Sequence, residues 1–549
     1  MRTSIRYLLS CGLIGMLSLG AAWAGAALTP VVPDELGHTP DVSKKPRIED
    51  GGAARKSSAS RPPQATGLMA GAAKVSMMPS PDAADGEVWE TENCRTLGED
   101  AASDADHVAD FRVRWLENSN CIYMGGYGIG PMNPITSWDD PYGLWVRSIA
   151  LSDGDDELVL TLIDAVYWEA RYNSMCGDYE GGCGWHDLQE QLGAELNLPE
   201  DSFMFASTHS HTAPDFIGGW GGVPEWYMHQ ITDSIKASVR ASLSNLKPAR
   251  LEIGESIVRE RNGERRDFYR SAEDDTFSWF RVTDAAQRPR RSNCAAGGAE
   301  PTPACPATKP GDVIATVGAY PAHPVTADPD PGIADADFPA VFARSLEGRF
   351  GGVGAFFQTG LGNLSPRGDK VAMGEGLATL VPALGRDEVV EEADLRVEQR
   401  RWDQPVTNIP LGSLGVTGFF GRTFNRFPTE VHAGKSSQRP CTSASPVSVD
   451  TGVTAAKLGP LWITGGPGEL FSNITNTIEE RNPRGVTLAL GLVNDGLGYI
   501  IQSFETDHVG RQGAGFVGSP AAEYEDAYST DHCFGDKTLE TTLQLLEEL

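Results

Sequence analysis

The chain has few basic residues for its size. Its 549 residues include 45 lysines and arginines against 75 aspartates and glutamates, so the formal net charge is −30. A surface of this sign repels phosphate backbones, which excludes a nucleic-acid partner, and it repels anionic membranes wherever no local basic patch intervenes. Hydrophobic residues make up 40% of the chain, which is enough for a large core and excludes disorder of the whole protein.

Long apolar runs are also missing. The one extended apolar stretch covers residues 7–19, which is shorter than the roughly 20 residues that a membrane-spanning helix needs. Two arginines precede it and Ala22-Trp23-Ala24 follows it, a pattern typical of a cleaved signal peptide. We therefore predict an exported protein, periplasmic or secreted, with signal peptide 1–24 and no transmembrane segment. A lipoprotein anchored through Cys11 is the alternative, and peripheral membrane contact and the oligomeric state stay open.

Paired C-x-x-C motifs, the usual mark of a cysteine zinc cluster, are absent as well. Removing the signal peptide takes away Cys11 and leaves eight cysteines, and an even number in an exported chain indicates disulfides. Eight cysteines allow 105 pairings, so the sequence alone does not choose among them. We predict that neighbours pair, as Cys94–Cys121, Cys176–Cys183, Cys294–Cys305 and Cys441–Cys533.

The composition divides the chain into a tether and a folded domain. Residues 25–86 are rich in Pro, Ala, Gly and Ser and cannot bury enough apolar surface to offset the cost of ordering, so we predict a disordered tether there and a single domain over 87–549. Apolar patterns in the domain predict helices over 224–248, after Glu469 and at the carboxyl end, and strands over 146–151, 158–163, 203–206, 313–320, 353–357, 461–464 and 486–493. The predicted fold class is α/β (mixed), a large layered domain with a mixed β-sheet and flanking helices.

Several side chains that can do chemistry follow these predicted strands. His209 and His211 alternate along extended chain, so both can face one site. His323 follows another strand, Ser365 lies in a small-residue loop that is not a G-x-S-x-G elbow, and Glu469 ends a glycine-rich turn. Each has a plain structural interpretation too: polar loop or packing histidines, a loop serine, and a carboxylate that the helix dipole favours at a helix amino terminus.

Taken together, these segments resemble the neutral/alkaline non-lysosomal ceramidase family. The shared motifs, in order, are Gly-Tyr within 124–127, His-x-His-x-x-Pro at 209–214, Pro-x-His at 321–323, Gln-Thr-x-x-Gly-Asn-Leu-Ser-Pro at 358–366, Gly-Gly-Pro-Gly-Glu at 465–469, and Gly-Leu-x-Asn at 491–494 followed by Tyr499. The resemblance covers roughly residues 120–549, and the serine and glutamate motifs are its most specific parts. It is limited to the catalytic domain, since the family's carboxyl-terminal immunoglobulin-like domain is lacking.

The resemblance implies one Zn²⁺ per chain and a set of catalytic residues. The metal ligands that it implies are His209, His323, Glu469 and Tyr499. The catalytic residues that it implies are Ser365 as the nucleophile, His211 for proton transfer beside the metal, Tyr524 as the oxyanion contact, and Arg265. The arginine is uncertain by one position because the family's Asn-Arg-Ser segment is replaced by Asn-Gly-Glu-Arg-Arg at 262–266, which leaves Arg266 as the alternative.

The chemistry of these residue types agrees with the implied activity. Two imidazoles, a carboxylate and a phenolate give zinc the nitrogen and oxygen ligands that it prefers. A serine hydroxyl is a weak nucleophile without activation, and zinc lowers the pKa of bound water to about 7 in favourable sites. The resemblance therefore implies hydrolysis of the amide bond in ceramide or a related N-acyl lipid, which releases a fatty acid and an amine (sphingoid base).

Three other functions are compatible with parts of the sequence. Segment 437–448 and the Cys176–Cys183 loop depart from the family pattern, so the substrate could be a different acyl amide or ester. A non-catalytic exported binding protein could retain the fold without turnover. A zinc-free serine hydrolase is the third alternative, although no Ser/His/Asp arrangement is apparent. The joint presence of four metal-ligand candidates and Ser365 favours the zinc enzyme.

Overall fold

The computed structural model describes residues 67–80, 89–92, 94, 96, 120–128, 130–138, 140–266, 273–286, 313–329, 331–382, 389–390, 393–408, 411–412, 421–425, 429–432, 441–505 and 524–549. The predicted signal peptide and most of the predicted tether lie outside these residues. The tether prediction was wrong for its carboxyl-terminal part. Met69–Ser76 form a strand, β1, that pairs along its whole length with β2 (Trp145–Ser152). The small residues that suggested a tether instead let β1 pack closely, since a Cβ on Gly71 would lie 2.1 Å from the carbonyl oxygen of Ser242.

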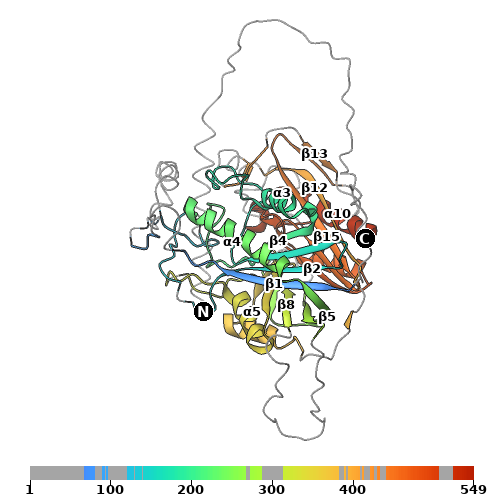
Figure 1. The fold of residues 1–549 in the computed structure, drawn as a ribbon. Coiled ribbons are helices and arrows are strands. Elements are labelled where there is room, and N and C mark those ends of the chain that lie inside the picture. The colour runs from blue at the N-terminus through green and yellow to red at the C-terminus, as the bar shows by residue number, and fades with distance from the viewer. Residues whose placement is uncertain are drawn as a thin grey trace, which may run out of the picture.

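The larger of two main sheets has nine strands. Its order is β4-β3-β2-β1-β5-β7-β8-β9, with β11 (Val389–Val390) paired to β5 off this path; Figure 1 shows β1 in blue beside β2. The bounds of its other strands are β3 Glu157–Ile163, β4 Phe203–Ser207, β5 Lys247–Ile257, β7 Thr276–Asp284, β8 Val313–Tyr320 and β9 Val353–Gln358. The strands predicted over 146–151 and 158–163 are confirmed as β2 and β3, which pair as an antiparallel hairpin.

The second main sheet packs face to face on the first. It has the order β12 (Leu395–Pro405), β15 (Ser448–Leu458), β16 (Leu461–Gly465) and β18 (Val486–Leu490). Alternate side chains of β3, such as Leu160 and Leu162, share one buried cluster with Ile463 and Leu488 of the second sheet. Because strand side chains point alternately to opposite faces, the other residues of each strand face outward and meet helices.

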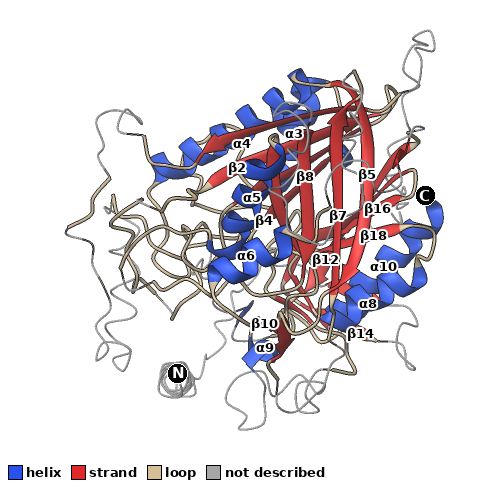
Figure 2. Ribbon diagram, turned by 90° about the horizontal axis from the view of Figure 1, so that it is seen from below, coloured by secondary structure: helices blue, strands red, loops and turns tan. Residues whose placement is uncertain are grey.

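Helices cover both outer faces, so the domain has four layers (Figure 2). Clusters on the outer face of the large sheet include residues of α3 (Trp185–Leu196), α4 (Glu225–Ser244), α5 (Asp337–Phe350) and α6 (Lys370–Ala378). The outer face of the smaller sheet meets α8 (Ser472–Arg481) and α10 (Phe534–Glu548). The predicted α/β class, with a mixed sheet and flanking helices, is confirmed. None of the helices that the structure describes is long and apolar enough to cross a bilayer.

Three pairs of parallel strands end at one edge of the two sheets, where the candidate site residues lie. The pairs are β3–β4, β8–β9 and β16–β18, and each pair is joined through a helix, namely α3, α5 and α8. Parallel strands joined in this way end at the same edge, and ligands usually bind beyond their carboxyl ends. Gln358 at the end of β9 donates from Nε2 to the Thr208 carbonyl (3.0 Å), and Gly491 donates to the Gln358 carbonyl (2.9 Å), so the three pairs end next to one another.

Disulfides close loops of very different length in the described part of the chain. The pairs Cys94–Cys121, Cys176–Cys183 and Cys441–Cys533 are present as predicted. Cys294 and Cys305, the fourth predicted pair, lie outside the described residues. The Cys441–Cys533 bond joins residues 92 positions apart and holds the segment before β15 to the start of α10.

The double variant Cys441→Ser/Cys533→Ser is expected to lower the free energy of unfolding more than Cys176→Ser/Cys183→Ser does. Loop-closure entropy predicts losses of about 4–5 kcal/mol for the long loop and about 2 kcal/mol for the short one. Thermal unfolding under non-reducing conditions, followed by circular dichroism, would measure both. An equal fall in Tm for the two double variants would contradict the loop-length argument.

Candidate metal centre and active site

Two buried histidines present the same ring nitrogen to one point. His209 lies just after β4 and His323 just after β8, and they are 2% and 1% exposed. Their Nδ1 atoms lie 3.1 Å from the carbonyl oxygens of Val166 and Leu364, respectively. A carbonyl oxygen only accepts, so each Nδ1 carries the proton and each Nε2 keeps its lone pair. Both rings are therefore held in the tautomer that a metal ligand needs.

Glu469 lies opposite these two nitrogens. Its Oε2 is 2.9 Å from Nε2 of His323 and 3.4 Å from Nε2 of His209. The residue belongs to a short parallel ladder in which β17 (Glu469–Leu470) pairs with β19 (Tyr499–Ile500), and Glu469 is the register partner of Tyr499. Because paired residues of neighbouring strands lie side by side, this ladder places Tyr499 next to Glu469 although the two are thirty positions apart in the sequence.

The ionisation of this cluster favours a bound cation. Burial alone would raise the pKa of Glu469, but His209 and His323 hold it well below its usual value, so the side chain is a carboxylate. Burial, reinforced by Arg265, lowers the pKa of His323 to about 4, so its imidazole is neutral. The neutral imidazole of His323 and the anionic Oε2 of Glu469 then direct lone pairs at one another inside the protein. A divalent cation removes this repulsion, and the donor set of nitrogen and oxygen fits zinc.

Tyr499 and Arg265 lie beside His323 and Glu469 and complete the site. The hydroxyl of Tyr499 accepts from Nη2 of Arg265 (2.7 Å), and Nη1 of Arg265 lies 3.4 Å from Nε2 of His323. Nε of Arg265 donates to Glu525 (2.7 Å), which belongs to α9 (Tyr524–Ala527). Burial alone would lower the pKa of Arg265, but the neighbouring oxygens of Tyr499 and Glu525 raise it. Arg265 therefore brings a permanent positive charge to the Tyr499 hydroxyl.

The two arginines at 265 and 266 take different positions. Arg266 is buried and also approaches Glu525, with Nε 3.9 Å from Oε2, but its guanidinium lies 5.0 Å from the ring centre of Phe471 and Nη2 donates to the Glu505 carbonyl (3.2 Å). Arg265 contacts Tyr499 and approaches His323. Of the two candidates from the sequence, Arg265 is the one beside the histidines and Tyr499.

His211 lies beside the two other histidines. Its Nε2 is 3.3 Å from Nε2 of His209, and its ring centre is 6.0 Å from that of His323. Burial and the neighbouring His209 hold the pKa of His211 well below its usual value. The backbone of Gly126 passes directly over the ring, because a Cβ there would lie 2.3 Å from Cγ of His211 and φ is +95°. Glycine is therefore required at 126 so that His211 can occupy this position.

Ser365 lies in a short ladder next to Arg265. The strands β6 (Asn262–Glu264) and β10 (Leu364–Pro366) pair so that Ser365 is opposite Gly263, and Arg265 donates its backbone N–H to the Asn363 carbonyl (3.1 Å). Ser365 is partly exposed and follows Leu364, whose carbonyl orients His323. The serine-bearing strand thus adjoins both the arginine and one of the histidines.

The small residues before Ser365 have a structural purpose that the sequence did not reveal. A Cβ on Gly362 would lie 2.6 Å from the carbonyl oxygen of Glu469, and one on Gly360 would lie 2.9 Å from Cα of Ser472. The amide of Asn363 also bonds Ser472, through Nδ2 to its hydroxyl (2.9 Å) and through Oδ1 from its N–H (2.9 Å). The glycines therefore let the serine loop pack against the Glu469 segment.

Two side chains of the cluster were missed from the sequence, and one predicted side chain is not described. The hydroxyl of Tyr167, in the segment after β3, donates to Oε1 of Glu469. Glu525, which follows the predicted Tyr524, accepts a hydrogen bond from Arg265. Tyr524 begins α9, but its side chain lies outside the described part of the structure. The only sequence signal for Tyr167 was that it is a polar aromatic residue soon after the strand predicted over 158–163.

Other histidine, cysteine and carboxylate groups are weaker metal candidates. His209, His211 and His323 offer ligand atoms within 4.8 Å of one another. Cys441, His532 and Cys533 also lie close together, but the two sulfurs are joined in a disulfide. Asp178, Glu225 and His229 form an outer group in which both carboxylates are exposed. In the part of the chain that is described, the buried histidine cluster is the best candidate metal centre.

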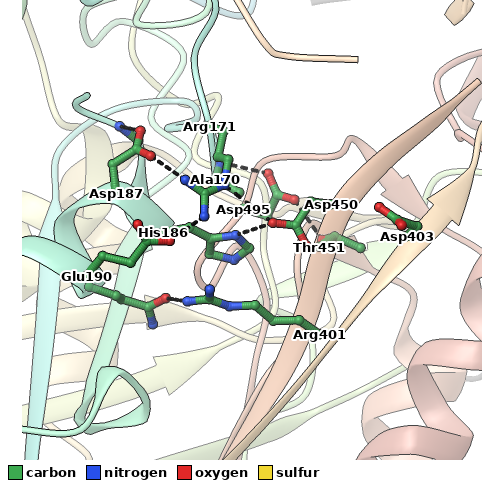
Figure 3. Close-up of polar contacts among 12 residues, drawn as sticks. Ala170, Arg171, His186, Asp187, Glu190, Arg401, Asp403, Asp450, Thr451 and Asp495 are labelled. Carbon is green, nitrogen blue, oxygen red and sulfur yellow. Dashed lines mark hydrogen bonds and ion pairs between the residues drawn. The ribbon is translucent and has the colours of Figure 1, made fainter. Parts of the chain in front are cut away.

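A buried ion cluster ties two of the site segments together. Nη1 of Arg422 donates to Oε2 of Glu169 (2.7 Å), and Nη2 donates to Oδ2 of Asp495 (2.8 Å). Glu169 lies in the segment that follows β3, and Asp495 lies in the segment that follows β18. Figure 3 shows the Asp495 carboxylate between the Ala170 backbone and Thr451, which donate to it at 3.0 and 2.6 Å. One arginine thus fixes the two segments that carry Tyr167 and Tyr499.

The fold and the site define a four-layer α/β domain with a buried histidine–carboxylate cluster. No sequence-family model and no curated protein sequence matches the chain significantly. Among solved structures, it is similar to the neutral ceramidase from Pseudomonas aeruginosa, with 15% identity and a TM-score of 0.54 over 88% of this chain and 75% of that one. A ceramidase complexed with C2 gives 14% identity and a TM-score of 0.55 over 88% and 76% of the two chains. The fold is therefore that of the neutral ceramidases, as the sequence motifs predicted.

Arg422→Leu is expected to lower the free energy of unfolding by about 3–5 kcal/mol, because it leaves the buried carboxylates of Glu169 and Asp495 without their cation. Arg400→Leu is the matched control, since Arg400 pairs with Glu548 at the surface, where both side chains are 39–51% exposed. That pair should contribute about 1 kcal/mol or less. Urea unfolding of both variants would compare them, and equal losses would contradict the importance of the buried cluster.

The metal-free protein is expected to lose stability as the pH falls from about 6.5 to about 4. In the folded protein burial lowers the pKa of His323 to about 4, whereas an unfolded histidine titrates near 6.5. Between these values the unfolded chain binds a proton that the folded protein excludes, so acid favours unfolding, by about 3 kcal/mol from this group alone. Urea unfolding at several pH values would measure the slope, which His323→Asn should flatten. An equally steep slope in that variant would refute the assignment.

Proposed function

We propose that this protein is a zinc-dependent hydrolase that cleaves the amide bond of ceramide or a related N-acyl lipid. The observation that carries the proposal is the meeting of His209, His323 and Glu469 at one buried point, with both imidazoles held in the metal-binding tautomer. In the proposal these three and Tyr499 hold the ion. When bound, zinc supplies a Lewis acid and lowers the pKa of a water molecule.

The protein side chains around the centre have separate roles in the proposed reaction. Ser365 is the nucleophile that attacks the amide carbonyl; the amine leaves with the proton given up by the Ser365 hydroxyl, and the acyl group stays on Ser365. His211, whose Nε2 lies 3.3 Å from Nε2 of His209, transfers protons in these steps, since its low pKa keeps its imidazole neutral and able to accept. Arg265 holds the Tyr499 hydroxyl and adds positive charge near the developing oxyanion. Tyr524 is retained as the second oxyanion contact on the basis of the sequence motif. A water molecule then releases the fatty acid from Ser365.

A buried apolar cluster packs beside the proposed centre. Val166, Tyr167, Ile217, Leu361 and Leu492 form this cluster, with the partly buried Trp220 packed against it. Tyr167 belongs to this cluster and also binds Glu469, so apolar side chains adjoin the proposed metal ligands. The ceramidases whose fold this chain shares add support for ceramide itself.

Ser365→Ala is expected to lower the hydrolysis of a short-chain fluorescent ceramide by about a thousandfold or more, because no other nucleophile replaces the hydroxyl. The variant should still bind one zinc ion per chain, as measured by mass spectrometry of the metal content. His209→Ala should lose both zinc and activity. Ser244→Ala, at the exposed end of α4, is the control and should leave both unchanged.

The outcomes separate the competing functions. Zinc binding without hydrolysis by the unaltered protein would contradict the enzyme and favour the non-catalytic binding protein. Hydrolysis that survives chelation, in a protein without zinc, would favour a zinc-free serine hydrolase. Full activity of Ser365→Ala with zinc bound would overturn the assignment of the nucleophile.

A further inference from the structure

Tyr167 contacts the carboxylate oxygen of Glu469 that does not face the two histidine nitrogens. Its hydroxyl donates to Oε1, whereas Oε2 faces Nε2 of His323 at 2.9 Å and Nε2 of His209 at 3.4 Å. The two oxygens of one carboxylate therefore have different partners. A hydrogen bond to Oε1 occupies that oxygen and fixes the plane of the carboxylate, which leaves Oε2 directed at the point where the imidazoles meet.

The ring of Tyr167 is confined by its neighbours. It stacks on Trp220 with 6.4 Å between ring centres and 17° between planes, and it meets the ring of His209 edge to face at 4.9 Å. On a third side a Cβ at Gly496 would lie 2.9 Å from Cβ of Tyr167, so the chain passes close by. Trp220 is in turn held by its backbone N–H, which donates to the Asp215 carboxylate at 2.7 Å. The phenol thus has little freedom to turn away from Glu469.

The backbone that carries Tyr167 is anchored at both sides. Ala165 accepts the backbone N–H of His209 (2.8 Å), and Ala170 donates to Asp495 (3.0 Å). Glu169 is bound to Arg422 (2.7 Å) in the buried ion cluster. These contacts fix the position of Tyr167 relative to the segment that carries Tyr499. The hydrogen bond to Glu469 is therefore set by the fold and does not depend on a flexible loop.

We propose that Tyr167 is a positioning residue of the metal centre, whose hydroxyl holds Glu469 so that only Oε2 is presented to the ion. This inference rests on the proposed function, because it assumes that His209, His323 and Glu469 bind a divalent metal. Tyr167 itself is assigned no contact with the reacting atoms. Its effect is exerted through the carboxylate, as is usual for groups that orient metal ligands.

The test is the metal affinity of the full chain carrying Tyr167→Phe, which removes the hydroxyl and keeps the ring. Competition with a chelator should show Zn²⁺ binding weakened about 10- to 100-fold. With Co²⁺ in place of Zn²⁺, the visible spectrum should change, because the freed Oε1 alters the coordination geometry. Tyr227→Phe is the matched control: Tyr227 is also buried and donates to the Met77 carbonyl (2.6 Å), but it lies on α4, in the core between that helix and the large sheet. Its variant should match the unaltered protein in both measurements.

The results distinguish the inference from the proposal beneath it. If the unaltered chain binds one Zn²⁺ and Tyr167→Phe binds it equally well with an unchanged Co²⁺ spectrum, the role of Tyr167 is refuted while the metal centre stands. If the unaltered chain binds neither ion, the proposed function itself fails. Should Tyr167→Phe not fold, Trp220→Ala decides, because it keeps the hydroxyl but removes the stacked ring. Weaker Zn²⁺ binding by that variant supports the inference, and unchanged binding overturns it.

Discussion

The organisation of this protein depends on the meeting of the Glu469 carboxylate with the imidazoles of His209 and His323 in a buried site. Glu469 is held as a carboxylate and His323 as a neutral ring, and their facing atoms are 2.9 Å apart. Such an arrangement is costly inside a protein unless a cation joins the lone pairs. The surrounding hydrogen bonds, from the Val166 and Leu364 carbonyls, orient the rings toward one another. The two imidazoles and the carboxylate are therefore held in a geometry suited to a bound metal ion.

The layered fold brings these groups together from distant parts of the chain. Each of the three parallel strand pairs ends at the same edge, and the turns after the strands carry the site residues. Glycines such as Gly362 let these turns approach one another more closely than any side chain would permit. Arg422 then fixes two of the turns through buried ion pairs. Precision at the site therefore comes from close backbone packing and buried charge, with the helices and sheets as a rigid support.

Much of the fold followed from hydrophobic patterns, and the exceptions have physical reasons. The strand at 313–320 and the helix after Pro224 were predicted because buried strands are continuous apolar runs and amphipathic helices repeat about every four residues. The strand β1 was missed, since Met69–Ser76 is made of small residues that resemble a linker. The long strands β12 and β15 were missed as well. β12 has charged side chains at several positions, such as Arg396 and Glu398, and these obscure the apolar pattern.

By itself, the sequence determined the motifs that contain His209, His211, His323, Ser365, Glu469 and Tyr499, because each combines a chemically distinctive side chain with small residues at fixed spacing. The prediction that neighbouring cysteines pair is confirmed for the three bonds that are described, although the sequence alone did not choose among the possible pairings. Only the tertiary structure decided that Arg265 and not Arg266 reaches the site, and that Tyr167 binds Glu469. These depend on which way a side chain points and on contacts across 302 positions of sequence. Local spacing carries no information about either, since both are set by how the strands and their turns pack.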